Sequence, residues 1–163
     1  MKNNFLLIGT LVAFGWSIQS QNISKNALGV RLGSNDGFGA EASYQRKLSG
    51  NNRLEFDLGI RNSNYINALK LAALYQWYWK IENGFHWYAG VGGGVGSWKY
   101  DRDKKDDNGS FGFVAGDIGI EYDFDFPLQI SLDLRPEIYF NADTYRDNNY
   151  GSDIGLGIRY RFN

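Results

Sequence analysis

Hydrophobic and polar side chains alternate with a period of two residues through most of the chain. The segment Leu128–Phe140 shows the pattern most clearly, because its even positions are apolar and its odd positions are polar. Successive side chains of a β-strand point to opposite faces of the sheet, so this segment is predicted to form a strand with one apolar and one polar face. Pro136 lies on the apolar face and lacks a backbone N–H, which predicts a bulge or a strand end there.

Segments with this alternation recur along the chain, separated by turn-forming residues, and they predict an all-β protein. The predicted strands cover residues 27–34, 38–48, 53–62, 68–81, 85–98, 111–124, 128–140 and 152–162. The connections at 49–52, 82–84 and 125–127 are tight, whereas those at 62–67, 99–110 and 141–151 are longer; only 35–37 departs from this rule. Alternation of short turns and longer loops is typical of transmembrane β-barrels. The predicted fold is therefore an eight-stranded antiparallel transmembrane up-and-down β-barrel.

The polar faces of these strands carry most of the charge. They hold nine basic and nine acidic residues, whereas the apolar faces hold one charge, Arg46, near a strand end from which its long side chain can reach water. An eight-stranded barrel has a lumen that side chains just fill. Charged side chains in such a lumen are costly unless they pair with one another, so we expect an ion-pair network and no continuous channel.

Aromatic side chains gather on the apolar faces near the tight turns. Rings from several strands at one level form the interfacial girdle of a membrane barrel, whereas a soluble core has no reason to collect them at one end. The residues predicted to lie at the lipid interface are Trp77, Trp79, Trp87, Tyr122 and Phe124, accompanied by Tyr44, Phe85, Phe126, Tyr160 and Phe162.

The N-terminal residues have the order of a secretory signal peptide. Lys2 precedes an apolar run over residues 5–16, and residues 17–21 are small or polar. A run of this length is too short for a transmembrane helix. We therefore predict a cleaved signal peptide over residues 1–20 and a barrel domain over residues 21–163.

Composition excludes several other classes of protein. The chain has 17 basic and 18 acidic residues, so no basic excess indicates binding to nucleic acid. It has no cysteine, and an exported protein of this kind must therefore be held together by hydrogen bonds and packing without disulfides.

The C-terminal segment resembles the assembly signal of outer-membrane barrels, with Gly157, Tyr160 and Phe162 at the matching positions. Residues 88–92, 119–122 and 127–136 resemble the small outer-membrane β-barrel domain family of Bacteroidetes-type bacteria, which is similar in architecture to the OmpA and OmpX barrels. The resemblance implies a monomer in the bacterial outer membrane. It also implies contact with membrane lipid and lipopolysaccharide, and recognition of the C-terminal strand by the barrel-assembly machinery. The family offers no shared catalytic residues.

Three features of the sequence invite a chemical interpretation. His86 is the single histidine, is predicted to face the lumen beside the turn at 82–84, and has no Ser or carboxylate placed beside it by a motif. The glycine run at 90–96 lacks the spacing of a phosphate-binding loop and has no helix after it, so it is predicted to allow curvature or the approach of a large inward side chain. Residues 101–109 are acidic, but Lys104 would occupy the first ligand position of a calcium loop, so a solvated outer loop is expected.

Trp98 and Tyr100 depart from the register set by Val91 and Val95, which predicts a bulge near residues 96–97. No catalytic, cofactor-binding or metal-binding residue is predicted. The expected function is that of a non-enzymatic, porin-like barrel protein with a structural or surface-interaction role through its outer loops. The alternatives are a lipid-modifying outer-membrane enzyme and a small solute pore.

The barrel interpretation predicts how the protein behaves on fractionation and in gels. We expect the mature chain to fractionate with outer membranes, because its apolar faces require lipid. We also expect the unboiled protein to migrate faster in a detergent gel than the boiled protein, because a closed barrel stays compact until heated. Recovery as a soluble periplasmic monomer would contradict the interpretation.

Overall fold

A computed structural model describes residues 24–34, 39–63, 66–100, 107–142 and 147–163. The predicted signal peptide over residues 1–20 lies outside these residues, as does most of the acidic segment at 101–109. No helix among the described residues is long and apolar enough to cross a bilayer.

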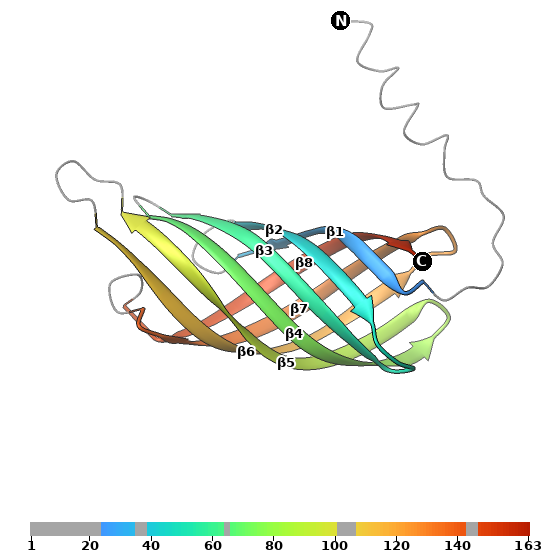
Figure 1. Ribbon diagram of the computed structural model, residues 1–163. Coiled ribbons are helices and arrows are strands. Elements are labelled where there is room, and N and C mark those ends of the chain that lie inside the picture. Colours follow the sequence, from blue (N-terminus) through green and yellow to red (C-terminus); the bar gives the residue numbers. More distant parts are fainter. Residues whose placement is uncertain (1–23, 35–38, 64–65, 101–106, 143–146) are drawn as a thin grey trace, which may run out of the picture.

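Eight antiparallel strands form one closed barrel in which each strand pairs with its neighbours in sequence and the first pairs with the last (Figure 1). The strands are β1 (Asn26–Gly33), β2 (Gly39–Lys47), β3 (Asn52–Ser63), β4 (Ile66–Glu82), β5 (Phe85–Tyr100), β6 (Asp107–Asp123), β7 (Leu128–Phe140) and β8 (Tyr150–Phe162). The predicted fold class is thus confirmed.

The three tight connections lie at one end of the barrel, together with the first residue of β1 and the last residue of β8; we call this end the turn end (Figure 1). The opposite end, where β3 meets β4, β5 meets β6 and β7 meets β8, is called the loop end. Closure by β1 and β8 is direct, since Asn26 pairs with Phe162 and Gly33 pairs with Gly155. The sheet formed by the described strands therefore has no free edge, which is the condition for a sheet to cross a membrane.

Side chains alternate between the lumen and the outer face of the barrel, at the odd and even positions predicted from the sequence. Leu132, Leu58 and Ile158 are 52%, 50% and 41% exposed on the outer face, whereas Arg31 and Arg135 are fully buried inside. β2 contributes the small exposed residues Ala40 and Ala42 to the same outer face. Apolar surface of this extent is unlike that of a soluble monomer. The molecule is apolar outside and polar inside, as lipid surroundings require.

The strands at the loop end are longer than predicted. β4, β5 and β6 contain 17, 16 and 17 residues, and β5 pairs with β6 as far as Tyr100 and Asp107. The predicted loop at 99–110 therefore contains strand residues at both of its ends, 99–100 and 107–110, and its middle lies outside the described residues. Polar composition had indicated a loop, but backbone pairing between neighbouring strands continues beyond the apolar stretch that faces lipid.

The bulge predicted near residues 96–97 is absent from the described pairing of β4 with β5. One register runs from Ile66 opposite Tyr100 to Lys80 opposite His86, and the irregularity lies between Lys80 and Glu82 instead. Trp98 does not break the alternation, because its side chain is buried inside the barrel with 6% exposure. The prediction failed because it assumed that every large aromatic side chain faces lipid.

Pro136 causes neither a bulge nor a strand end. β7 continues through it, opposite Ser152 of β8. Pairing with β6 stops opposite Gly116 and Asp117 and resumes in the same register, so the missing N–H interrupts one ladder without shifting it. Gly116 leaves the space, because a Cβ atom there would lie 3.3 Å from Cγ of Pro136.

The inside-out arrangement predicts a depth-dependent effect of charge on the outer face. Leu132 pairs with Leu156, about midway along the paired length of β7 and β8. Leu132→Arg should lower the free energy of unfolding by roughly 2–4 kcal/mol, because it places a charge in the hydrocarbon. Ile138→Arg, near the loop end, should cost only about 0–1 kcal/mol. Urea unfolding in lipid vesicles measures both, and equal costs would contradict the assignment of depth.

Candidate functional site

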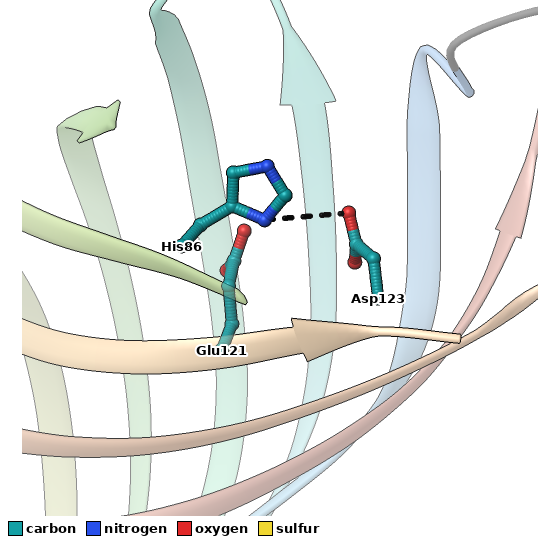
Figure 2. Close-up of side chains that lie close together, drawn as sticks. All are labelled: His86, Glu121 and Asp123. Atoms are coloured by element: carbon teal, nitrogen blue, oxygen red, sulfur yellow. Dashed lines mark ion pairs between the residues drawn. The ribbon is translucent and has the colours of Figure 1, made fainter. Parts of the chain in front are cut away.

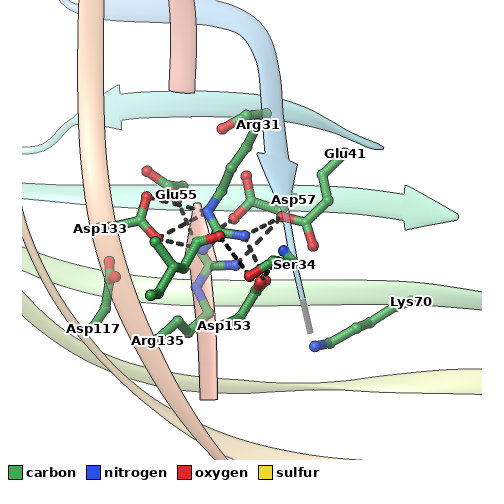
Figure 3. A network of polar contacts seen from close by, with 12 residues as sticks. Arg31, Ser34, Glu41, Glu55, Asp57, Lys70, Asp117, Asp133, Arg135 and Asp153 are labelled. Atoms are coloured by element: carbon green, nitrogen blue, oxygen red, sulfur yellow. Dashed lines mark hydrogen bonds and ion pairs between the residues drawn. The ribbon is translucent and has the colours of Figure 1, made fainter. Parts of the chain in front are cut away.

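The middle of the lumen is filled by arginine side chains surrounded by carboxylates (Figure 3). Arg31 of β1 donates from Nε to Asp133 at 3.0 Å and from Nη1 to Asp153 at 2.8 Å and Glu41 at 3.2 Å. Gly155 of β8 makes room for it, since a Cβ atom there would overlap the guanidinium group. Four strands thus meet at one buried guanidinium.

A second part of the network centres on Glu55 of β3. Arg135 donates from Nη2 to Glu55 at 2.9 Å and to Asp57 at 2.8 Å. Arg159 donates from Nη2 to Glu55 at 3.2 Å and from Nη1 to Ser131 at 2.8 Å. These side chains are 0–2% exposed, and their partners come from strands on different sides of the barrel. The network therefore ties the barrel wall together across its interior.

The predicted network of ion pairs is present in the lumen, and some of the predicted inward charges lie at the more exposed turn end. Five basic and eight acidic side chains are buried among the described residues. Lys47, Asp123 and Arg161 are partly exposed and Lys80 is exposed, while the side chain of Arg61 lies outside the description. Arg31, Arg135 and Arg159 are at most 1% exposed, so the centre of this network lies away from the solvent-accessible surface.

An apolar cluster occupies the lumen toward the loop end, which the sequence analysis missed. Its aromatic members are Trp98, Phe111, Phe113 and Tyr139. Gly94 and Gly96 face Phe113 and Phe111 so closely that a Cβ atom on either glycine would overlap a ring. The glycine run therefore allows the close approach of large inward side chains, as predicted, and the side chains at its loop end are phenylalanines.

Lys70 joins this apolar cluster to the ionic network. Its Nζ atom donates to both carboxylate oxygens of Glu137 at 2.6 Å and lies 4.4 Å from the ring centre of Phe113. Parity could have placed the two phenylalanines, because Phe111 and Phe113 are separated by even numbers of residues from the inward Asp117 and Glu121. Hydrophobicity alone does not separate lipid-facing from lumen-facing aromatic residues.

The turn end opens into a polar cavity of about 980 Å³. Its basic lining residues are Lys25, Lys47, Arg53, Lys80 and Arg161, and its acidic lining residues are Glu121, Asp123 and Asp125. Arg53 is 5% exposed; it donates from Nη1 to Glu121 at 2.9 Å and from Nε to Gln76 at 2.6 Å. We call this cavity the vestibule.

His86 faces the vestibule between two carboxylates (Figure 2). Nδ1 lies 3.8 Å from Oδ2 of Asp123, and Glu121 is the cross-strand partner of His86 on β6. The predicted inward position at the turn end is confirmed. No sequence motif placed a carboxylate beside His86, because its carboxylate neighbours come from the adjacent strand β6.

The residues predicted at the lipid interface lie on the outer face toward the turn end. Trp77, Trp79 and Trp87 are 38%, 36% and 40% exposed, and the rings of Trp79 and Trp87 stack with centres 4.3 Å apart. Tyr122 and Phe124 are half-buried and pack edge to face with centres 4.8 Å apart. Contact of these rings with the lipid interface stays a prediction.

The three positions of the predicted assembly signal point in two directions. Gly157 faces the lumen, where a Cβ atom would overlap the hydroxyl of Ser131 and the guanidinium of Arg159. Tyr160 and Phe162 are exposed on the outer face, at 59% and 37%. The glycine therefore has a packing role in the folded barrel, and recognition of the segment during assembly stays a prediction.

Comparison with known proteins finds likeness in fold. No family model and no curated protein sequence matches the chain. The N-terminal β-barrel domain of Pseudomonas aeruginosa OprF is similar with a TM-score of 0.69 and 10% identity, over 85% of this chain and 98% of that one. Neisserial surface protein A gives 0.63 and 12%, over 84% and 94%. The Yersinia pestis attachment invasion locus protein Ail gives 0.58 and 15%, over 85% and 97%.

These similarities and the barrel geometry define a class: the chain has the fold of the eight-stranded outer-membrane β-barrel proteins. The apolar exterior agrees with the predicted location in the bacterial outer membrane. At these identities the likeness concerns the fold, and the Bacteroidetes-type affiliation stays a prediction.

The buried network predicts a large effect of removing one arginine. Arg135→Met keeps much of the volume but leaves Glu55 and Asp57 without that partner, so the free energy of unfolding should fall by roughly 3–5 kcal/mol. Lys80→Met at the exposed rim should change it by less than about 0.5 kcal/mol. Urea unfolding in lipid vesicles measures both. Adding Asp57→Asn to Arg135→Met should restore part of the loss, and a fully additive double variant would contradict the coupling.

Proposed function

We propose that the chain is a non-enzymatic outer-membrane protein with a structural or surface-interaction role exerted at its loop end. The observation that carries the proposal is the length of β4, β5 and β6, with 17, 16 and 17 residues. A barrel strand needs about 9–11 residues to cross the hydrocarbon core. Each of these strands is therefore longer than the hydrocarbon core requires. At the loop end, pairing of β5 with β6 reaches Asp107, whereas the described pairing of β6 with β7 begins at Gly112.

The paired strand ends at the loop end support an interaction role because they form a rigid and exposed surface. Tyr100 pairs with Ile66 of β4 and with Asp107 of β6, so β5 is paired with both neighbouring strands up to its last residue. Lys99 is exposed on β5, and Tyr150 at the start of β8 is 55% exposed. A preformed surface of this kind binds a partner at a lower entropic cost than a flexible loop does.

The interior supports the proposal against the rival function of a solute pore. The ion pairs of Arg31, Arg135 and Arg159 occupy the middle of the lumen, and the cluster around Phe113 occupies it toward the loop end. Passage of a solute would require several buried charges to lose their partners together, which is costly in a medium of low polarity. Conduction is therefore not part of the proposed function.

The rival function of a lipid-modifying enzyme rests on His86 and its neighbour Asp123. The pair lies at the turn end, which would be the periplasmic side in an outer-membrane barrel. Among the described residues, the imidazole contacts this carboxylate and the edge of the Tyr78 ring, with centres 6.1 Å apart, and neither contact offers an activated hydroxyl. Acyl transfer would need such a nucleophile within hydrogen-bond reach.

The remaining partners belong to the same proposal. Membrane lipid would cover the apolar outer face, and lipopolysaccharide headgroups would meet the loop end. The barrel-assembly machinery would recognise Gly157, Tyr160 and Phe162 on β8, and the protein would act as a monomer. The closed sheet supports the monomer, since β1 and β8 satisfy each other without a second chain.

Photo-crosslinking in intact cells tests the interaction role. A crosslinking amino acid at Tyr150 should capture a defined surface protein or polysaccharide, because this side chain is exposed at the loop end. The same amino acid at Asn51, exposed in a turn-end connection, is the matched control and should not capture that partner. Mass spectrometry of the adducts identifies the partner.

Lipid A from the same cells distinguishes the rival enzyme. We expect deletion of the gene to leave lipid A acylation unchanged, and His86→Gln to leave both lipid A and barrel assembly unchanged. If deletion altered acylation and folded His86→Gln protein reproduced that change, the enzyme would replace the proposed function.

In the crosslinking experiment, equal capture at Tyr150 and Asn51 would contradict the interaction role.

A further inference from the structure

Three metal-binding side chains converge at the turn end of the lumen. One ligand atom each of His86, Glu121 and Asp123 can be chosen so that all three lie within 4.8 Å of one another. His86 lies on β5, and the two carboxylates occupy successive inward positions of β6 (Figure 2). We propose that these three residues form a binding site for Zn²⁺.

The burial of the ligand atoms is the second observation that points to an ion. Nδ1 of His86 and Oδ1 of Asp123 are each inaccessible to water and accept or donate no hydrogen bond, whereas Oε2 of Glu121, equally inaccessible, is ion-paired with Arg53. Glu121 as a whole is only 3% exposed. Buried polar atoms nearly always have a partner, and a bound ion is one accepted reason for two neighbouring atoms to lack one.

The two carboxylates are held in position from behind by arginines. Arg53 forms an ion pair with Glu121 at 2.7 Å, and Arg161 forms one with Asp123 at 3.3 Å. Arg161 is itself fixed by donation to the carbonyl oxygens of Phe124 at 2.5 Å and Phe126 at 3.3 Å. Outer partners of this kind orient metal ligands and keep them from collapsing onto one another.

Charge and donor type select the ion. The two arginines balance the two carboxylates, so the site lacks the excess negative charge and the six or more oxygen atoms that Ca²⁺ takes. An imidazole nitrogen with two carboxylate oxygens instead suits Zn²⁺, a borderline ion that binds three protein ligands and a water molecule. Ligand atoms on tetrahedral zinc lie about 3.4 Å apart, close to the 3.8 Å between Nδ1 of His86 and Oδ2 of Asp123.

The vestibule supplies a route to the site, since it is lined by all three ligands. A bound ion would link β5 to β6 beside the tight turn that joins β4 to β5. This inference goes beyond the proposed loop-end function and does not depend on it. The proposal departs from the sequence-based expectation of no metal-binding residue.

Titration calorimetry on the full protein in detergent micelles tests the site. We expect one Zn²⁺ per chain near neutral pH, with no competition from Mg²⁺ or Ca²⁺. His86→Gln and Asp123→Asn should each weaken binding by at least roughly 10-fold, because each removes a ligand. Asp125→Asn, which removes an exposed carboxylate that lines the same vestibule outside the trio, should leave the affinity unchanged.

Stability provides an independent readout. Zn²⁺ should raise the urea midpoint of the unaltered protein in a concentration-dependent way, because it binds the folded state, and should not raise that of His86→Gln. The heat-dependent gel shift shows whether each variant is folded. Absence of Zn²⁺ binding by the unaltered protein, or equal Zn²⁺ affinity in the unaltered protein and His86→Gln, would overturn the proposal.

Discussion

Closure of the backbone hydrogen-bond network is the constraint on which the rest of this structure depends. In hydrocarbon, an unpaired N–H or C=O group costs several kcal/mol, about the amount by which a whole domain is stable. Pairing of β1 with β8 removes the two free edges of the sheet. Once the sheet is closed, every strand has one face toward the lumen and one toward the surroundings, and each side chain must suit one of the two.

The interior chemistry follows from that division. Polar faces that a soluble protein would turn to water are here directed into a narrow lumen, where charges must find partners. Arg31, Arg135 and Arg159 each contact groups from several strands. Their branched guanidinium groups therefore link the strands across the interior, as packed apolar side chains do in the core of a soluble protein. Glycines on the lumen face, such as Gly155 and Gly157, supply the space for these long side chains. The filled lumen leaves the two ends as the places where the protein can meet other molecules.

The two ends differ in what they offer. At the loop end, paired strands of unequal length present a rigid surface, which is suited to contact with large partners. At the turn end, a polar vestibule reaches His86 and two carboxylates, which is suited to a small ion. The same barrel can therefore support separate roles at its two ends, because the buried ionic network between the ends separates the vestibule from the solvent at the loop end. The fold itself does not select among such roles.

The sequence by itself determined the strand number, the face of nearly every side chain and the polar lumen. These are local properties: a period of two residues requires no knowledge of distant residues, and turn-forming residues mark the connections between strands. It did not determine that Trp98, Phe111 and Phe113 fill the lumen, because hydrophobicity favours lipid and a packed interior equally. It also did not bring Glu121 and Asp123 beside His86, because the alternation within each strand does not set the register of β5 against β6. That register is decided when the barrel closes, by the pairing and packing of all eight strands together.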